Sequence, residues 1–268
     1  MMLAIRHETI YRYTAPMSYT IQQLRLTPRS EAHQRIRDWR VTSPGSCHSY
    51  LDAYGNQSHI LTVNGMHDEI RIVAAGRLDV DELDRGRLDG LDGKDRLSPL
   101  VYTVTTRLTE ADAGLADFAR RNLDGTDSRA AMALAEAITG AVSYLTGATE
   151  VTTTAQDALK LGKGVCQDHA HLFLACCHVQ GIPARYVSGY IDPGNSDHAE
   201  SHAWVDVWVE DSDFTGWASI DVTHANFQNA QYCRLAIGRD YDSAAPVRGL
   251  RRGGGVESME VHVSVERR

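Results

Sequence analysis

The most informative stretch of this chain reads Gly162-Lys163-Gly164-Val165-Cys166-Gln167-Asp168-His169-Ala170-His171-Leu172. An apolar run follows it and ends at Gly181-Ile182-Pro183. Glycines before the stretch, Asp168 in its first turn, and the glycine and proline at its end are typical of a helix that begins at or near Cys166. The free N–H groups and the positive dipole at that helix end favour a thiolate, the nucleophilic form of cysteine. We therefore interpret Cys166 as a candidate nucleophile.

The alternative for any free cysteine is that it serves as a small buried hydrophobe. We accept this alternative for Cys176 and Cys177, which lie in the middle of the same helix among apolar residues. For Cys166 the flanking glycines and polar residues mark an entry point to the helix, so we favour a catalytic role there.

A thiol nucleophile needs a base, and the base needs a group that orients it. His202 stands at the head of the alternating segment Ala203-Trp204-Val205-Asp206-Val207, which predicts a strand. Asp221 interrupts a second β run further along, at a separation typical of adjacent antiparallel strands. We favour His202 as the base and Asp221 as the orienting carboxylate. His169 lies on the same helix as Cys166 and stays an alternative base.

The chain divides into three predicted parts of different composition. Residues 1–76 contain short runs of period-two alternation separated by proline and glycine, which predicts an antiparallel β domain. Residues 77–105 are polar and lack a sustained period, so we expect a linker. Residues 106–268 contain helical signals, then strands, and we expect the alternating residues 256–266 to return to the first sheet. The predicted fold class is α+β.

Several motifs together resemble the core of the bacterial transglutaminase-like superfamily. In order along the chain they are Gly164-Val165-Cys166-Gln167-Asp168-His169-Ala170-His171-Leu172, Gly181-Ile182-Pro183-Ala184-Arg185-Tyr186-Val187-Ser188-Gly189-Tyr190, His202-Ala203-Trp204-Val205 and Asp221. The resemblance extends to an N-terminal β domain through Tyr54-Gly55-Asn56 and to downstream segments at Gly238-Arg239-Asp240-Tyr241 and Pro246-Val247-Arg248-Gly249. It implies a papain-like triad of Cys166, His202 and Asp221.

The chain departs from the family pattern at one place. The usual Asp-Pro-Thr appears as Asp221-Val222-Thr223, which keeps the acid but lacks the rigid turn of proline. An oxyanion hole also needs two donors, and the backbone N–H of Cys166 supplies one. Gln167 and Tyr144 are the candidates for the second.

A zinc site is the main rival interpretation, because twelve histidines are many for 268 residues. His198 and His202 are four residues apart, and His169 and His171 lie close to Cys166. The first pair follows Pro193-Gly194-Asn195 and runs directly into a strand, so its spacing is not helical and does not align the two rings. We therefore expect no metal and no cofactor.

Composition limits the class of partner and the compartment. The chain is 43% hydrophobic and 23% charged, as in folded proteins, and its net charge of −8 disfavours nucleic acid and anionic membranes as partners. It begins without a signal-like apolar run, and no stretch approaches the length of a membrane helix. Five cysteines without a C-x-x-C pair suit a reducing compartment, so we expect a cytoplasmic protein.

These observations predict a cysteine-dependent enzyme that acts on amide bonds of a peptide or protein through a thioester. Hydrolysis, as in a peptidase or amidohydrolase, is favoured over transglutaminase-like acyl transfer, because water needs no second binding site. The alternative is a non-catalytic peptide-binding module on the same fold, which would contain no hyper-reactive cysteine.

Overall fold

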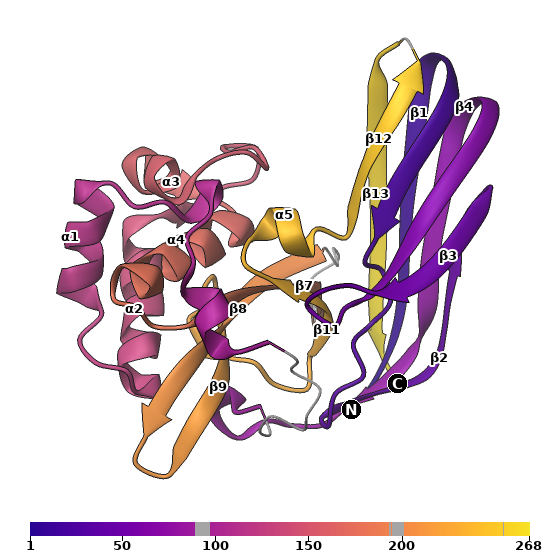
Figure 1. The fold of residues 1–268 in the computed structure, drawn as a ribbon. Coiled ribbons are helices and arrows are strands. Elements are labelled where there is room, and N and C mark those ends of the chain that lie inside the picture. The colour runs from indigo at the N-terminus through magenta and orange to yellow at the C-terminus, as the bar shows by residue number, and fades with distance from the viewer. Residues whose placement is uncertain (89–96, 193, 195–200, 254) are drawn as a thin grey trace.

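The computed structural model describes residues 1–88, 97–192, 194, 201–253 and 255–268 of the chain. It contains 24% helix and 48% strand, which confirms the predicted α+β class. Figure 1 shows a tall sheet that stands beside a second sheet covered by helices. Within the described residues, no helix has the length and apolar character needed to cross a membrane.

The tall sheet contains six strands. In chain order these are β1 (Met2–Leu24), β2 (Gln34–Thr42), β3 (Ser46–Leu51), β4 (Gln57–Val80), β12 (Val247–Gly253) and β13 (Glu257–Arg267). The long strands β1 and β4 pair antiparallel at its centre, and β2 and β3 pair with the other side of β4. Alternate residues of β1, such as Leu3, Ile5 and Tyr11, are buried, as the period-two pattern predicts.

The end of the chain completes this sheet. Residues 256–266, which we expected to return to the first sheet, do so within β13, which pairs with β1 from Leu3 to Tyr13. The preceding strand β12 pairs with the distal half of β1, so the two C-terminal strands pair with successive parts of β1. The predicted core, residues 106–268, therefore ends in two strands that belong to the N-terminal sheet.

The segment predicted as a linker, residues 77–105, contains regular structure that packs on both sheets. The boundary at residue 76 lies inside β4, because Leu78 and Val80 are buried and continue the strand. Further on, Leu88 and Tyr102 are buried against Trp217 of the second sheet, so apolar side chains fasten this polar segment to the core. Residues 89–96 lie outside the described part of the chain.

The second sheet has the order β10-β9-β8-β7-β11, and all its neighbours are antiparallel. Its strands are β7 (Ala184–Ile191), β8 (Ser201–Asp211), β9 (Phe214–Asp221), β10 (Asn226–Phe227) and β11 (Tyr232–Gly238). The helices are α1 (Ala113–Asn122), α2 (Ser128–Ala141), α3 (Ala155–Leu161), α4 (Cys166–Val179) and α5 (Tyr241–Ala244). Short 3-10 turns span η1 (Asp84–Gly86), η2 (Pro99–Thr103) and η3 (Arg107–Thr109), and a small parallel pair joins β5 (Ser143–Tyr144) to β6 (Lys163–Gly164).

Helix α4 is the central element of the core. It packs between the other helices and strands β7 and β8, and residues 167–178 are all buried. Because the helix is buried on every side, its polar side chains Asp168, His169 and His171 make hydrogen bonds within the protein. This burial fixes the start of α4, and hence Cys166, relative to β8.

The interface between the two sheets includes an apolar layer and the buried side chain of His7. Leu3, Ile5 and Val265 of the tall sheet pack with Tyr190 of β7. Beside them, the ring nitrogens of His7 bond the hydroxyl groups of Tyr190 and Thr9, each at 2.8 Å. His7 is almost fully buried, and this burial lowers its pKa to about 4.

Because the pKa of His7 is depressed in the folded protein, its contribution to stability is present above about pH 6.5 and is lost as the pH falls towards 4. Glutamine keeps hydrogen-bonding groups but cannot titrate. When the pH is lowered from about 7 to about 5, we therefore expect the free energy of unfolding to fall by about 2 kcal/mol less in His7→Gln than in the parent. Urea unfolding at the two pH values measures the difference. Equal losses in the two proteins would contradict this role of His7.

Candidate active site

Cys166 is the first residue of α4 and is half-buried. The helix start is held by Asp168, whose Oδ2 accepts hydrogen bonds from the backbone N–H of Val165 at 2.8 Å and from Thr149 Oγ1 at 2.6 Å. A Cβ at position 164 would lie 2.8 Å from the Asp168 side chain, so Gly164 is required for this cap. The backbone N–H of Cys166 belongs to the first turn, which has no intrahelical acceptor for it.

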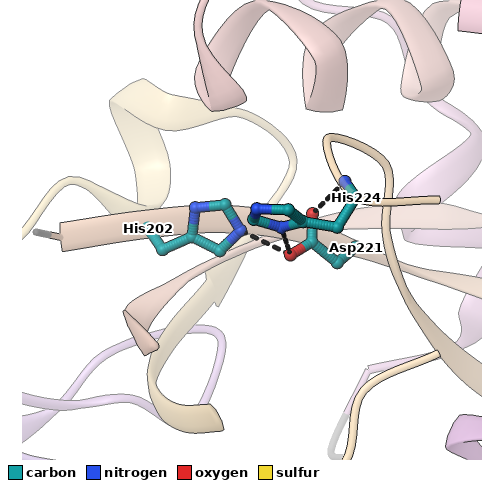
Figure 2. A group of neighbouring side chains, drawn as sticks. All are labelled: His202, Asp221 and His224. Carbon is teal, nitrogen blue, oxygen red and sulfur yellow. Dashed lines mark hydrogen bonds and ion pairs between the residues drawn. The ribbon is translucent and has the colours of Figure 1, made fainter. Parts of the chain in front are cut away.

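His202 and Asp221 come from the adjacent strands β8 and β9, as the sequence predicts. The His202 Nε2 atom donates to Asp221 Oδ2 at 2.7 Å, and Figure 2 shows the ring directed at that oxygen. The indole of Trp204 stacks on the imidazole, with ring centroids 6.1 Å apart. Both the hydrogen bond and the stacking restrict the ring to one orientation.

The protonation of His202 reflects its two neighbours. Burial disfavours the charged ring, but hydrogen bonds to Asp221 and Cys166 outweigh burial and raise the pKa of His202 to about 10. Since Nε2 is engaged by the carboxylate, Nδ1 is the nitrogen left for the thiol. A charged imidazole next to a cysteine sulfur favours the nucleophilic form of a thiol.

Asp221 is fully buried and accepts five hydrogen bonds. Its Oδ2 accepts from His202 and His224 Nδ1, both at 2.7 Å, and from Tyr232 Oη at 2.8 Å. Its Oδ1 accepts from the backbone N–H groups of Thr223 at 3.0 Å and His224 at 3.2 Å. Burial opposes ionisation, but the bonds from His202 and His224 hold the pKa of Asp221 well below its usual range.

His224 is the residue that sequence reasoning missed. It is half-exposed and contacts the same carboxylate oxygen as His202, with the two imidazole centroids 5.4 Å apart (Figure 2). The sequence feature that could have indicated His224 is its position three residues after Asp221, in the turn that lacks proline. The backbone bonds from residues 223 and 224 to Asp221 hold this turn in the absence of proline.

The group formed by His202, Asp221 and His224 also has the donor atoms that a divalent metal prefers, all within 4.8 Å of one another. Hydrogen bonds between the imidazoles and the carboxylate account for their arrangement without an ion. In the zinc pattern of the sequence, His198 lies outside the described residues, and His171 Nε2 accepts from the Tyr241 backbone at 3.1 Å. The absence of a metal requirement stays a prediction.

The alternative base, His169, is buried and bonded elsewhere. Its Nε2 bonds the carbonyl oxygen of Val142 at 3.0 Å, and its Nδ1 bonds Thr223 Oγ1 at 3.1 Å. Because burial lowers its pKa and both nitrogens have partners, His169 supports the site and is less suited than His202 to take a proton from Cys166.

The two candidates for the second oxyanion donor lie in different settings. Gln167 lines the same cleft as Cys166, but its Nε2 donates to the carbonyl oxygen of Val151 at 3.1 Å. Tyr144 lines the cleft and is half-exposed, and the β5–β6 pairing sets it opposite Gly164, next to the start of α4. The position of Tyr144 is therefore the more suitable of the two.

The remaining thiols differ from Cys166 in their surroundings. Cys176 and Cys177 are fully buried in α4, and burial raises the pKa of Cys176 to about 12 and that of Cys177 well above its usual value. Cys233 is buried in β11, and burial raises its pKa too. Cys47 is exposed on the tall sheet. The interpretation of Cys176 and Cys177 as core residues agrees with this burial.

Cys166 and His202 lie at a cleft of about 310 Å³ between the tall sheet and the helical core. The core side of the cleft includes Tyr144 and Gln167, and its other wall comes from β1 and β13. A cleft of this size matches the lower range of small-ligand sites in proteins.

Two family models match the chain. The bacterial transglutaminase-like N-terminal region matches residues 3–79, and the transglutaminase-like superfamily matches residues 116–222. An uncharacterized protein of Mycobacterium leprae is 30% identical over 285 residues, and the match covers 99% of this chain and 98% of that protein. The chain belongs to the transglutaminase-like superfamily.

Other relatives agree with this membership. An uncharacterized protein of Mycobacterium bovis is 27% identical, over 92% of this chain and 86% of that protein. The crystal structure of a Cytophaga hutchinsonii protein, provisionally named a cysteine protease, has the same fold, with a TM-score of 0.79 at 22% identity over 99% of this chain and 90% of that one. The resemblance predicted from the sequence is confirmed, and the transglutaminase-like chain has the fold of a family of cysteine enzymes.

Proposed function

We propose that this transglutaminase-like protein cleaves amide bonds by covalent catalysis through a thioester on Cys166. The observation that carries the proposal is the arrangement of three groups: a thiol at a helix N-terminus, an imidazole that interacts with it, and a buried carboxylate that holds the imidazole at 2.7 Å.

In the first half of the proposed reaction, the Cys166 thiolate attacks the amide carbonyl carbon and forms a C–S bond. The carbonyl electrons move to oxygen, where the backbone N–H of Cys166 and the hydroxyl of Tyr144 are the proposed donors. The His202 imidazolium then gives its proton to the amide nitrogen, the C–N bond breaks, and the amine leaves.

In the second half, the neutral His202 imidazole takes a proton from water as the water attacks the thioester. The C–S bond breaks, the carboxylic acid leaves, and the imidazolium and thiolate are restored. Asp221 keeps the ring in the required tautomer throughout. A primary amine in place of water would give transamidation, and we favour hydrolysis because water needs no second binding site.

The test is turnover of a peptide library, with a parallel incubation of glutamine-donor peptides and a primary amine. We expect new amino termini in the library, no amine incorporation, and no product with Cys166→Ala. Amine incorporation that depends on Cys166 would favour acyl transfer. Peptide binding without any product, from a protein whose Cys166 reacts like an ordinary thiol, would favour the non-catalytic binding module.

A further inference from the structure

The wall of the cleft that faces Cys166 includes two rungs of the β1–β13 ladder. Thr9 pairs with Val261 and Tyr11 pairs with Met259, and all four residues line the cleft together with Cys166. Residues close to both ends of the chain therefore form one side of the proposed active site.

The inward face of β13 changes from covered to open along the strand. Val265 is 7% exposed and Val263 packs with it against the interface with β7. Towards the cleft the same face carries Val261 at 43% and Met259 at 58% exposure. Alternate residues share one face of a strand, so the four side chains form a single apolar row of which only the cleft end lacks a cover.

The outward face of the same strand is polar. Glu260 bonds Arg12 at 2.7 Å, and His262 is largely exposed beside it. The strand thus keeps apolar residues on its inward face and polar residues on its outward face, even where the inward side chains are open to the cleft. Leaving Met259 and Val261 uncovered costs hydrophobic free energy, and an apolar side chain bound in the cleft would recover it.

Apart from the Cys166–His202 pair, the described lining of the cleft is uncharged. Among its described lining residues there is no aspartate, glutamate, lysine or arginine, although charged residues are 23% of the chain. A charged side chain that packed against the β1–β13 side of this cleft would lose water without gaining an aspartate, glutamate, lysine or arginine partner there. The lack of charged side chains and the exposed apolar area therefore both favour an uncharged, apolar ligand.

We propose that the Met259–Val261 wall is a specificity site that binds uncharged, apolar side chains of the peptide whose carbonyl reacts with Cys166. This inference rests on the proposed function, because it assumes that the peptide is presented to the thiol. It adds a substrate class: peptides with aliphatic or aromatic residues beside the scissile amide.

The test uses acetyl-dipeptidyl vinyl sulfones that carry leucine, glutamine, lysine or glutamate at both positions. These probes alkylate Cys166, and intact mass gives the rate of modification. Each rate is divided by the rate with iodoacetamide, which has no side chain. We expect the leucine probe to react at least about tenfold faster than the lysine and glutamate probes on this scale.

Two neighbouring substitutions on β13 serve as a matched pair. Val261→Lys adds a charge to the cleft wall, and we expect it to slow the leucine probe about tenfold and to raise the relative rate of the glutamate probe. His262→Lys adds a charge to the outward face of the same strand and is expected to leave the preference unchanged. His262→Lys should also leave the iodoacetamide rate unchanged, and dividing by that rate corrects for any effect of the Val261→Lys charge on the thiol itself.

The outcomes separate this inference from the proposed function. If iodoacetamide modifies Cys166 no faster than an ordinary thiol, the proposed function fails. If iodoacetamide reacts rapidly at Cys166 but the charged probes keep pace with the leucine probe, or if His262→Lys acts as strongly as Val261→Lys, the specificity site is refuted and the proposed function stands.

Discussion

His202→Ala is expected to lower amide turnover by about 10²–10⁴-fold and to move the alkylation of Cys166 to higher pH. The first effect follows from the loss of the group that carries the proton to the leaving amine. The second follows from the loss of the imidazolium. Since the pKa of His202 is raised to about 10, the ring stays charged through the neutral range and stabilises the thiolate there.

The measurement is iodoacetamide labelling with mass mapping from about pH 5 to about pH 9, a range that brackets the usual cysteine pKa. In the parent protein we expect Cys166 to be modified first, at a pH where the exposed thiol of Cys47 is still unreactive. In His202→Ala, the labelling of Cys166 should rise only as the pH approaches about 8.5, as for an ordinary thiol. Cys176 and Cys177 should be silent in both proteins because they are fully buried.

Asp221→Asn is the matched variant, because it disturbs the orientation of the His202 ring but keeps the imidazole beside Cys166. It should weaken turnover while Cys166 stays partly reactive, because the carboxylate contacts His202 and does not contact sulfur. Equal labelling of Cys47 and Cys166 at neutral pH, or unchanged labelling of Cys166 in His202→Ala, would contradict the triad and favour the binding module.

Asp206→Asn is expected to destabilise the protein by about 3–5 kcal/mol, because it removes the buried negative charge that two buried guanidinium groups share. Asp206 is fully buried in β8 and accepts from Arg234 at 2.9 and 2.6 Å and from Arg185 at 2.7 Å. Arg234 is itself fully buried in β11 and also lies 2.9 Å from Glu31, which precedes β2. The loss should therefore weaken both the second sheet and its contact with the tall sheet.

Urea unfolding measures this loss, and Asp38→Asn is the control. The Asp38–Arg77 pair is a similar ion pair at 2.5 Å, but both side chains are about half-exposed. Exposed pairs of this kind contribute about 0–1 kcal/mol because water and salt screen them. A loss in Asp206→Asn no larger than in Asp38→Asn would show that the buried network does not stabilise the fold.

Local patterns in the sequence were sufficient for the elements that carry the proposed triad. Glycine and an acidic first turn mark the start of α4 at Cys166, and period-two alternation marks β8 and β9 with His202 and Asp221. These signals are readable because caps and strand alternation depend on residues a few positions apart. The same reasoning predicted the α+β class and the final strand β13.

The rest depended on contacts between residues that are distant in the chain. Only the folded protein brings Tyr11 against Met259 as one wall of the cleft, and only there does Arg234 reach Glu31. His224 became visible as a second partner of Asp221 once the turn after β9 was in place. Strand register and buried ion pairs are selected by the packing of whole sheets, and no local period in the sequence encodes them.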